Sequence, residues 1–223
     1  MKKALSVCAV LAVPAVVIIG AAAFQDRYYS LISVLAAVLT CVPFFLSFER
    51  GSRPTRRIVM LAVMVALSVA GRFVFAPIPF FKPVTAMVII SALFFGSEFG
   101  FLTGALSALV SNMYFGQGPW TPFQMFAWGL IGFIAGLMSD PLKRSRILLA
   151  VYSAISGVVF SLIMDVWTTL WADGSFNLSR FTASVVTSLP IMLIYIVSNT
   201  IFVLALFPLF NKKIERLKLK YGI

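Results

Sequence analysis

The chain contains no histidine and little charge. Only 11% of its 223 residues are Asp, Glu, Lys or Arg, and just seven of these are acidic. A soluble domain carries about 25% charged residues, so this composition cannot cover a surface exposed to water. The missing histidine also removes the usual general base and the commonest metal ligand. The sequence therefore excludes a water-soluble enzyme and predicts no metal centre.

The chain has only two cysteines and lacks a common nucleotide-binding motif. The two cysteines, Cys8 and Cys41, stand inside apolar runs without metal-ligand spacing, which predicts small buried side chains rather than disulfides or a zinc site. No Gly-x-x-x-x-Gly-Lys-[Ser/Thr] motif occurs, so the chain lacks that type of phosphate-binding loop. If the protein moves a solute uphill, the energy must come from a partner or from coupling to an ion.

Apolar residues take the place of charge. They make up 61% of the chain, and the mean hydropathy is +1.02. Because a helix needs about 20 apolar residues to cross about 30 Å of hydrocarbon, we predict an all-α integral membrane protein of about eight helices. The shortest run allows a thin, tilted or re-entrant helix. The predicted ranges are Ala4–Phe24, Tyr29–Phe48, Ile58–Phe75, Val84–Phe95, Phe99–Phe115, Phe123–Met138, Ile147–Trp171 and Ala183–Phe210.

The basic residues are concentrated on one side of this topology. The net charge of +11 therefore indicates cytoplasmic loops rather than a nucleic-acid partner, and the positive-inside rule places both termini in the cytoplasm. Fourteen of the 18 Lys and Arg residues lie on that side: Lys2, Lys3, Arg50, Arg53, Arg56, Arg57, Lys143, Arg144, Arg146, Lys212, Lys213, Arg216, Lys218 and Lys220.

The polar segment Glu49–Arg57 is the best internal boundary. It separates an N-terminal transmembrane helical pair (residues 1–50) from a six-helix core (residues 51–223). The first run also imitates a secretory signal, with Lys2 and Lys3 before an apolar stretch that ends in small residues. Its length, and the second helix that follows at once, favour retention over cleavage.

Three stripes of small residues recur at four-residue spacing. They are Ala62, Ala66 and Ala70, then Gly96, Gly100 and Gly104, then Gly132 and Gly136. Such a stripe lets another helix approach closely. Its ordinary use is packing within the chain, and at most one of the three need face another subunit.

Polar and aromatic side chains gather in the loop that joins the fifth and sixth predicted helices. Two glycines and two prolines give this segment, Tyr114–Gln124, an irregular backbone. Asn112, Gln117, Thr121 and Gln124 offer hydrogen bonds, and Trp120 offers a flat apolar surface. We predict a ligand site on the outer side; the alternative for Trp120 is the aromatic belt of a membrane interface.

Two charges, Arg72 and Asp165, interrupt apolar runs near the outer ends of their helices. A charge at such a position needs a partner or a wet cavity, so the two either pair with each other or line an outward-facing pocket. The segment Pro77–Pro83 closes the same side. Together these features predict a pocket for a bulky, partly polar organic ligand. The candidate substrate-binding residues are Arg72, Phe81, Lys82, Asn112, Gln117, Trp120, Thr121, Gln124, Asp165 and Trp167.

From Arg56 to Phe210 the order of these elements resembles the S-components, the substrate-binding membrane subunits of energy-coupling factor (ECF) vitamin transporters. The usual S-component has six helices, so the pair before Glu49 departs from the common pattern. The resemblance rests on the alanine stripe, on Phe80-Phe81-Lys82-Pro83-Val84-Thr85-Ala86, on Phe94-Phe95-Gly96-Ser97-Glu98-Phe99-Gly100, and on Gly116-Gln-Gly-Pro-Trp-Thr-Pro122 followed by Gly129-x-x-Gly-Phe-x-x-Gly136.

The resemblance implies a mechanism and partners. An S-component binds its vitamin from outside and topples in the bilayer against a transmembrane coupling subunit, driven by two cytoplasmic ATPase subunits that use ATP. The family's docking stripe corresponds to Ala62, Ala66 and Ala70. The chain would then be a multi-pass protein of a prokaryotic plasma membrane with no intrinsic cofactor.

The ligand is less narrowly defined. The chain is most similar to cobalamin-specific S-components, so cobalamin is the expected ligand, with another vitamin or a precursor as the alternative. A second hypothesis is a secondary carrier that transports its substrate without partner subunits. A lipid-modifying enzyme is disfavoured by the lack of histidine and of clustered carboxylates.

Overall fold

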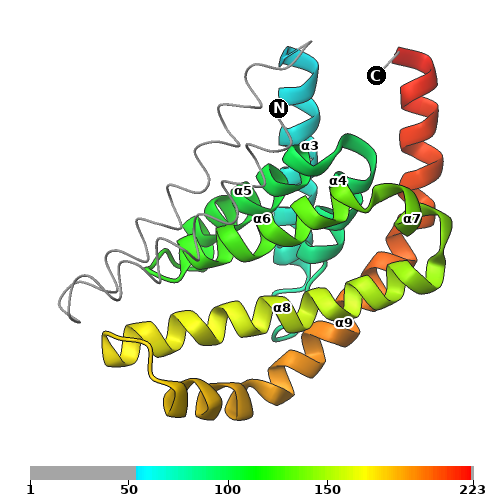
Figure 1. The fold of residues 1–223 in the computed structure, drawn as a ribbon. Helices are drawn as coiled ribbons and strands as arrows, with labels where there is room; N and C mark the ends of the chain where they lie inside the picture. The colour runs from blue at the N-terminus through cyan, green and yellow to red at the C-terminus, as the bar shows by residue number, and fades with distance from the viewer. Residues whose placement is uncertain (1–53, 222–223) are drawn as a thin grey trace, which may run out of the picture.

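The computed structural model describes residues 54–221, and every regular element in this range is an α-helix. The predicted all-α class is therefore confirmed, whereas the predicted helical pair at residues 1–50 lies outside the described residues. Figure 1 shows the helices in chain order: α3 (Pro54–Val74), α4 (Val84–Phe95), α5 (Ser97–Phe115), α6 (Thr121–Leu137), α7 (Ser139–Arg144), α8 (Arg146–Asp173) and α9 (Leu178–Tyr221).

Helix α4 forms the centre of the described bundle. Eleven of its 12 residues are buried, and it packs against α3, α5, α6 and α9. A helix that is apolar all round must be covered by protein or by lipid, and here the neighbouring helices cover it. At about 1.5 Å per residue it is about 18 Å long, which explains why the fourth predicted run is so short. Gly96, with φ of 98°, ends α4 and leads directly into α5.

Three helices, α3, α8 and α9, are long and apolar enough to cross a membrane, whereas α4 and α6 are shorter apolar helices. Helix α3 turns Leu61, Met64, Val65 and Ser68 inward. This is the spacing of one helix face. The described part of the chain is thus a multi-pass membrane protein with one large apolar core and a smaller apolar cluster around Phe123 and Leu170.

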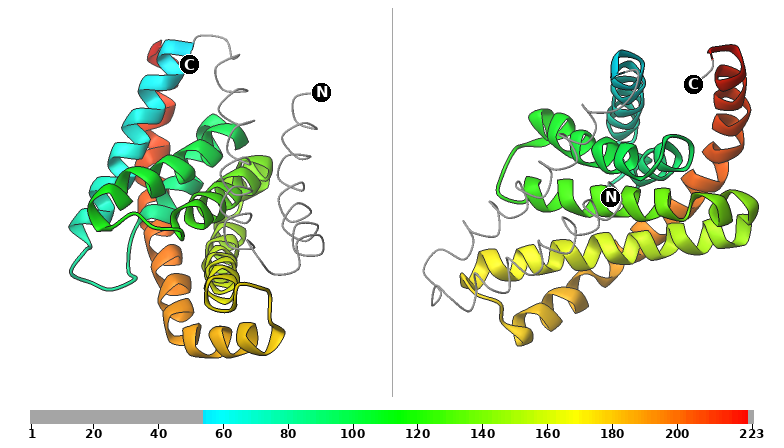
Figure 2. Two further views of the ribbon diagram at one scale, coloured as in Figure 1. Left: turned by 90° about the vertical axis from the view of Figure 1, so that its left-hand side faces the viewer. Right: turned by 45° about the horizontal axis from the view of Figure 1, so that its top comes forward.

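The last two long helices, α8 and α9, pack against each other. They approach closely at Gly157, where an added Cβ would lie 2.7 Å from the Ile196 nitrogen. Helix α9 contains Pro190 and Pro208; proline removes a helix hydrogen bond and bends the axis. Figure 2 shows the change of direction along α9. The helix is also longer than the predicted Ala183–Phe210, because it continues through the basic segment after Phe210.

The connection between α6 and α8 contains the short helix α7, where the sequence predicts only a loop. Its apolar residue Leu142 is fully buried, so burial holds the turn in place. Ser145 then starts α8, its hydroxyl accepting a hydrogen bond from the Leu148 backbone N–H at 3.2 Å. Ser is a favoured residue at this capping position.

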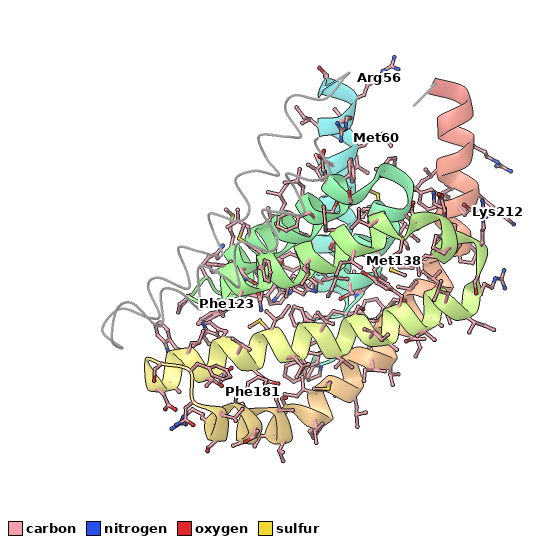
Figure 3. All side chains as sticks on the ribbon, viewed as in Figure 1. Arg56, Met60, Phe123, Met138, Phe181 and Lys212 are labelled. Carbon is pink, nitrogen blue, oxygen red and sulfur yellow. The ribbon has the colours of Figure 1, made fainter. Side chains whose placement is uncertain are left out.

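The described helices present two contrasting ends. One end, the basic end, carries Arg56, Arg57, the α7 segment and Lys212. The other, the loop end, carries the α3–α4, α5–α6 and α8–α9 connections. In Figure 3, Arg56 and Lys212 lie toward one end, and Phe123 and Phe181 lie toward the other.

Candidate substrate-binding site at the loop end

Four predicted site residues from three helices form one hydrogen-bond network. Arg72 of α3 donates to the hydroxyl of Ser111 and, at 2.8 Å, to the side-chain oxygen of Asn112 on α5. The Asn112 amide donates in turn to Thr121 at 2.9 Å and to Gln124 at 2.8 Å, both on α6. The structure therefore joins residues that the sequence separates by up to 52 positions, from Arg72 to Gln124.

The local backbone explains why α5 and α6 meet at this point. Helix α5 ends at Gly116, whose φ of 104° lies in a region that L side chains rarely adopt. Helix α6 begins at Thr121, with proline in its first turn, where the missing N–H is not needed. The short connection thus places the last turn of α5 beside the first turn of α6.

Two cations share one aromatic ring beside this network. The Arg72 guanidinium carbon lies 4.7 Å from the centre of the Phe115 ring, and the Lys82 Nζ lies 5.1 Å from it. Arg72 is only 9% exposed, and its Nε has no hydrogen-bond partner. Burial, and then the charge of Arg72, lower the pKa of Lys82. Within the described chain no carboxylate forms an ion pair with either residue, so the pair is an uncompensated positive site.

Asp165 is not the partner of Arg72, so of the two alternatives for these charges the mutual ion pair is wrong. Asp165 is buried at 6% exposure and accepts a hydrogen bond from Ser188 of α9 at 2.8 Å. The physical reason is orientation, since Arg72 points toward α5 while Asp165 points toward α9.

Trp120 and Trp167 meet edge to face, with ring centres 5.9 Å apart, and Trp171 stacks on Trp167 at 6.3 Å. The indole N–H of Trp167 is buried without a hydrogen-bond partner. The aromatic ring of Trp120 also covers Gly118, where a Cβ would lie 2.3 Å from it. The Trp120 ring therefore packs against its own loop and against Trp167 at the loop end.

Phe81 and Gln117 do not join the network. Phe81 packs against Phe202 of α9, with ring centres 5.0 Å apart. Gln117 is exposed, and its amide donates to the Leu109 backbone carbonyl at 2.8 Å. The loop that carries Phe81 is nevertheless fixed: the Ser198 hydroxyl accepts from the Lys82 N–H at 3.0 Å and bonds the Lys82 carbonyl at 3.2 Å.

Phe80 in this loop has φ of 61°, an unusual conformation for a residue other than glycine. Such conformations persist where the surroundings hold them, and they cluster at functional sites. The contact between the Phe80 and Tyr195 rings, 6.0 Å apart, links this strained residue to α9.

Trp128 is not among the residues predicted from the sequence, although it contacts Arg72 of the network. Its indole N–H donates to Thr85 of α4 at 3.2 Å, its ring stacks on Phe160 at 4.9 Å, and Arg72 lies 5.6 Å from its ring. Tyr195 extends this aromatic cluster through Phe160 at 5.1 Å. A single Trp within an apolar helix gives no sequence signal of such a role, whereas Ser111, also missed, stands next to Asn112.

The three small-residue stripes have different surroundings. An added Cβ at Gly100 would lie 2.7 Å from the Gly132 carbonyl oxygen, and one at Gly104 would lie 2.5 Å from the Trp128 backbone. These glycines therefore join α5 to α6. The alanines Ala62, Ala66 and Ala70 are all exposed on α3, on the face that the described helices leave open.

The described residues thus form a multi-pass helical membrane protein whose loop end combines a buried arginine, a half-buried lysine, amides and aromatic rings. Residues 53–212 match the family model described as "ECF-type riboflavin transporter, S component". The chain belongs to this family: it is an S-component, a substrate-binding subunit that works with an ECF module rather than an enzyme. Neither the comparison with curated proteins nor that with solved structures found a match.

Proposed function

We propose that this S-component captures a vitamin from outside the cell at its loop end and releases it inward. The basic end then faces the cytoplasm. This orientation is supported by the distribution of Lys and Arg, which leaves few cations near the α5–α6 connection. It is also supported by the polar network of Arg72, Asn112, Thr121 and Gln124, which lies where α3 and α5 end and α6 begins, away from the basic end.

Our choice of ligand rests on the Arg72–Lys82 pair, whose positive charges have no anionic partner among the described residues. A buried positive charge is costly unless an opposite charge meets it, and Arg72 keeps an unpartnered Nε beside Lys82. A ligand with an anionic group would supply the missing partner. Cobalamin carries a phosphodiester, and its rim of amides suits Asn112 and Gln124. We therefore propose cobalamin as the substrate.

Riboflavin is the second candidate, because the matching family model bears its name. Its flat ring system would suit stacking on Trp128 or Trp167. It is uncharged at neutral pH, however, and would leave the Arg72–Lys82 pair without an opposite charge.

Delivery requires contact with the membrane subunit of the ECF module. We propose that Ala62, Ala66 and Ala70 form that contact. The stripe is exposed along α3, and small side chains let a partner helix approach its backbone. The partner would thus approach α3 on the face opposite to its buried residues Leu61, Met64, Val65 and Ser68.

Isothermal titration calorimetry on the purified full chain tests the ligand. We expect cobalamin to release heat, and cobinamide, which lacks the phosphodiester, to bind more weakly. Losing a hydrogen bond to a charged group costs about 1.5–3 kcal/mol, which is about 10- to 150-fold in Kd. Arg72→Gln and Lys82→Gln should therefore weaken cobalamin binding by that range and leave cobinamide binding nearly unchanged.

Arg180→Gln is the matched control, because Arg180 is a cation of the same end whose charge is already paired with Asp173. It should bind cobalamin like the unchanged protein. Heat from riboflavin but not from cobalamin would overturn the cobalamin proposal and leave the S-component function intact. No heat from any vitamin would overturn the site itself.

A further inference from the structure

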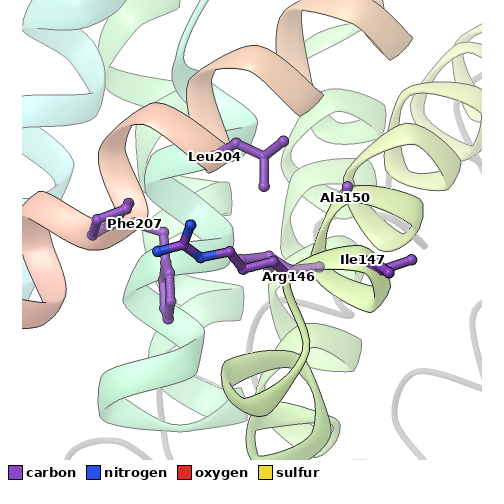
Figure 4. A pocket seen from close by; sticks show the side chains of 7 residues that line it. Arg146, Ile147, Ala150, Leu204 and Phe207 are labelled. Carbon is purple, nitrogen blue, oxygen red and sulfur yellow. The ribbon is translucent and has the colours of Figure 1, made fainter.

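A cavity lies at the basic end, away from the loop-end network of Arg72, Asn112, Thr121 and Gln124. The first turn of α8 and the α9 segment around Pro208 enclose about 340 Å³. Figure 4 shows Ile147 and Ala150 on one side, and Leu204 and Phe207 on the other. Among the described residues, Arg146 is the only charged one that lines the cavity.

The geometry of the two helices produces this cavity. They touch at Gly157, about three turns from Arg146, and leave a gap between them at the basic end. Pro208 cannot donate a backbone hydrogen bond and disturbs the helix beside the gap. The flanks are apolar and open, since Ile147 is 79% exposed and Leu209 is 59% exposed. Exposed apolar side chains of this kind are expected to contact the hydrocarbon of the membrane.

Charge defines what can occupy the gap. Arg146 is exposed, and its side chain forms no ion pair or hydrogen bond within the described chain. In Figure 4 its side chain extends from α8 toward Phe207. Lys143 and Arg144 precede it, and Lys212 and Lys213 follow the cavity segment on α9. An occupant must therefore be apolar along the gap and negative at the membrane surface.

We propose that this cavity binds one anionic phospholipid, with an acyl chain against Ala150, Leu204 and Phe207 and the phosphate on Arg146. Basic side chains beside a membrane surface attract anionic headgroups, and an Arg with an apolar stem can lie along hydrocarbon while its charge stays at the headgroup level. The proposal rests on the membrane location of the family and not on the identity of the vitamin. A failure here leaves the loop-end site untouched.

Native mass spectrometry of the purified full chain tests the proposal. The protein is released from micelles that contain equal amounts of palmitoyl-oleoyl phosphatidylglycerol and phosphatidylcholine. We expect one phosphatidylglycerol to stay bound in preference to phosphatidylcholine. Arg146→Gln should lower its retention about fivefold, and Arg146→Lys should largely restore it. Ala150→Phe, which fills the gap, should abolish retention and leave vitamin binding unchanged.

Arg144→Gln is the matched control, because Arg144 is exposed at the same end but does not line the cavity. If it lowers retention as much as Arg146→Gln, the attraction is diffuse and the proposed site is wrong. Equal retention of the two lipids would overturn the role of Arg146. A dimer that disappears in Ala150→Phe would assign the cavity to a second copy of the chain and overturn the lipid.

Discussion

The alanine stripe of α3 and the glycine stripes of α5 and α6 share one sequence pattern and have opposite surroundings. Gly100, Gly104 and Gly132 lie in a seam where the backbones of α5 and α6 approach so closely that a single added carbon would overlap main-chain atoms. Ala62 and Ala66 stand on an exposed face of α3. The spacing of small residues therefore indicates a smooth helix surface, and the surrounding helices decide what that surface contacts.

The difference between Gly and Ala has a physical basis. Without a Cβ, glycine allows backbone-to-backbone contact, but it also costs about 1 kcal/mol of helix stability relative to alanine. The seam tolerates this loss of helix stability because the close contact of α5 and α6 holds the residues of the binding network together. Alanine keeps the helix of α3 stable while no described helix covers it, and it still leaves room for a partner.

The largest effect should come from Gly132→Leu. Its Cβ would lie 2.4 Å from the Gly100 carbonyl oxygen, and backbone atoms cannot rotate away as a side chain can. We expect little folded, monodisperse protein on size-exclusion chromatography in detergent. Ala66→Leu, the same side chain on the exposed stripe, should be purified at normal yield. Equal yields would mean that the seam is looser than the structure shows.

Ala66→Trp should abolish vitamin uptake in cells that carry the ECF module, because the bulky ring prevents a partner helix from approaching α3. Calorimetry on the isolated protein should give an unchanged Kd, since Ala66 lies on the opposite face of α3 from its buried residues. Loss of binding together with uptake would show that the stripe packs within the chain and would remove the functional contrast with the glycine seam.

Gly104→Ala should have an intermediate effect. The new methyl group would lie 2.5 Å from the Trp128 backbone carbon, so α6 must shift. Overpacking of this kind costs about 1–3 kcal/mol, offset in part by the higher helix propensity of alanine. We expect a lower melting temperature, and weaker vitamin binding as Trp128 and Gln124 move. A variant with higher stability and unchanged affinity would contradict the close seam.

The smallest effect should come from Ala66→Gly, which makes the exposed stripe resemble the seam. Helix propensity predicts a loss of about 1 kcal/mol, visible as a small decrease in melting temperature. Uptake should stay close to that of the unchanged protein, because the stripe remains smooth. A large loss of uptake would mean that the alanine methyl groups themselves contact the coupling subunit.

Much of the candidate site could be predicted from residue type and position. Asn112, Thr121 and Gln124 stand out as polar groups around an irregular loop, and Arg72 as a charge within an apolar run. Trp128 could not be found in this way, because an aromatic residue in an apolar helix is indistinguishable from ordinary core. Gln117 and Gln124 are both amides of the same loop, so the sequence predicts the same role for each. The Gln117 amide, however, donates to the Leu109 carbonyl and its side chain is exposed.

Sequence alone determined the all-α membrane class, since hydrophobic content and the length of apolar runs depend on composition and not on contacts. It also determined the ends of α4, where Pro83 and Gly96 interrupt the helix locally. Only the tertiary structure decided which groups meet: Arg72 with Asn112 rather than with Asp165, and glycine stripes buried while the alanine stripe is exposed. The reason is that side chains project from all sides of a helix. The periodicity of one helix shows which residues share a face but does not identify the neighbour that packs against that face.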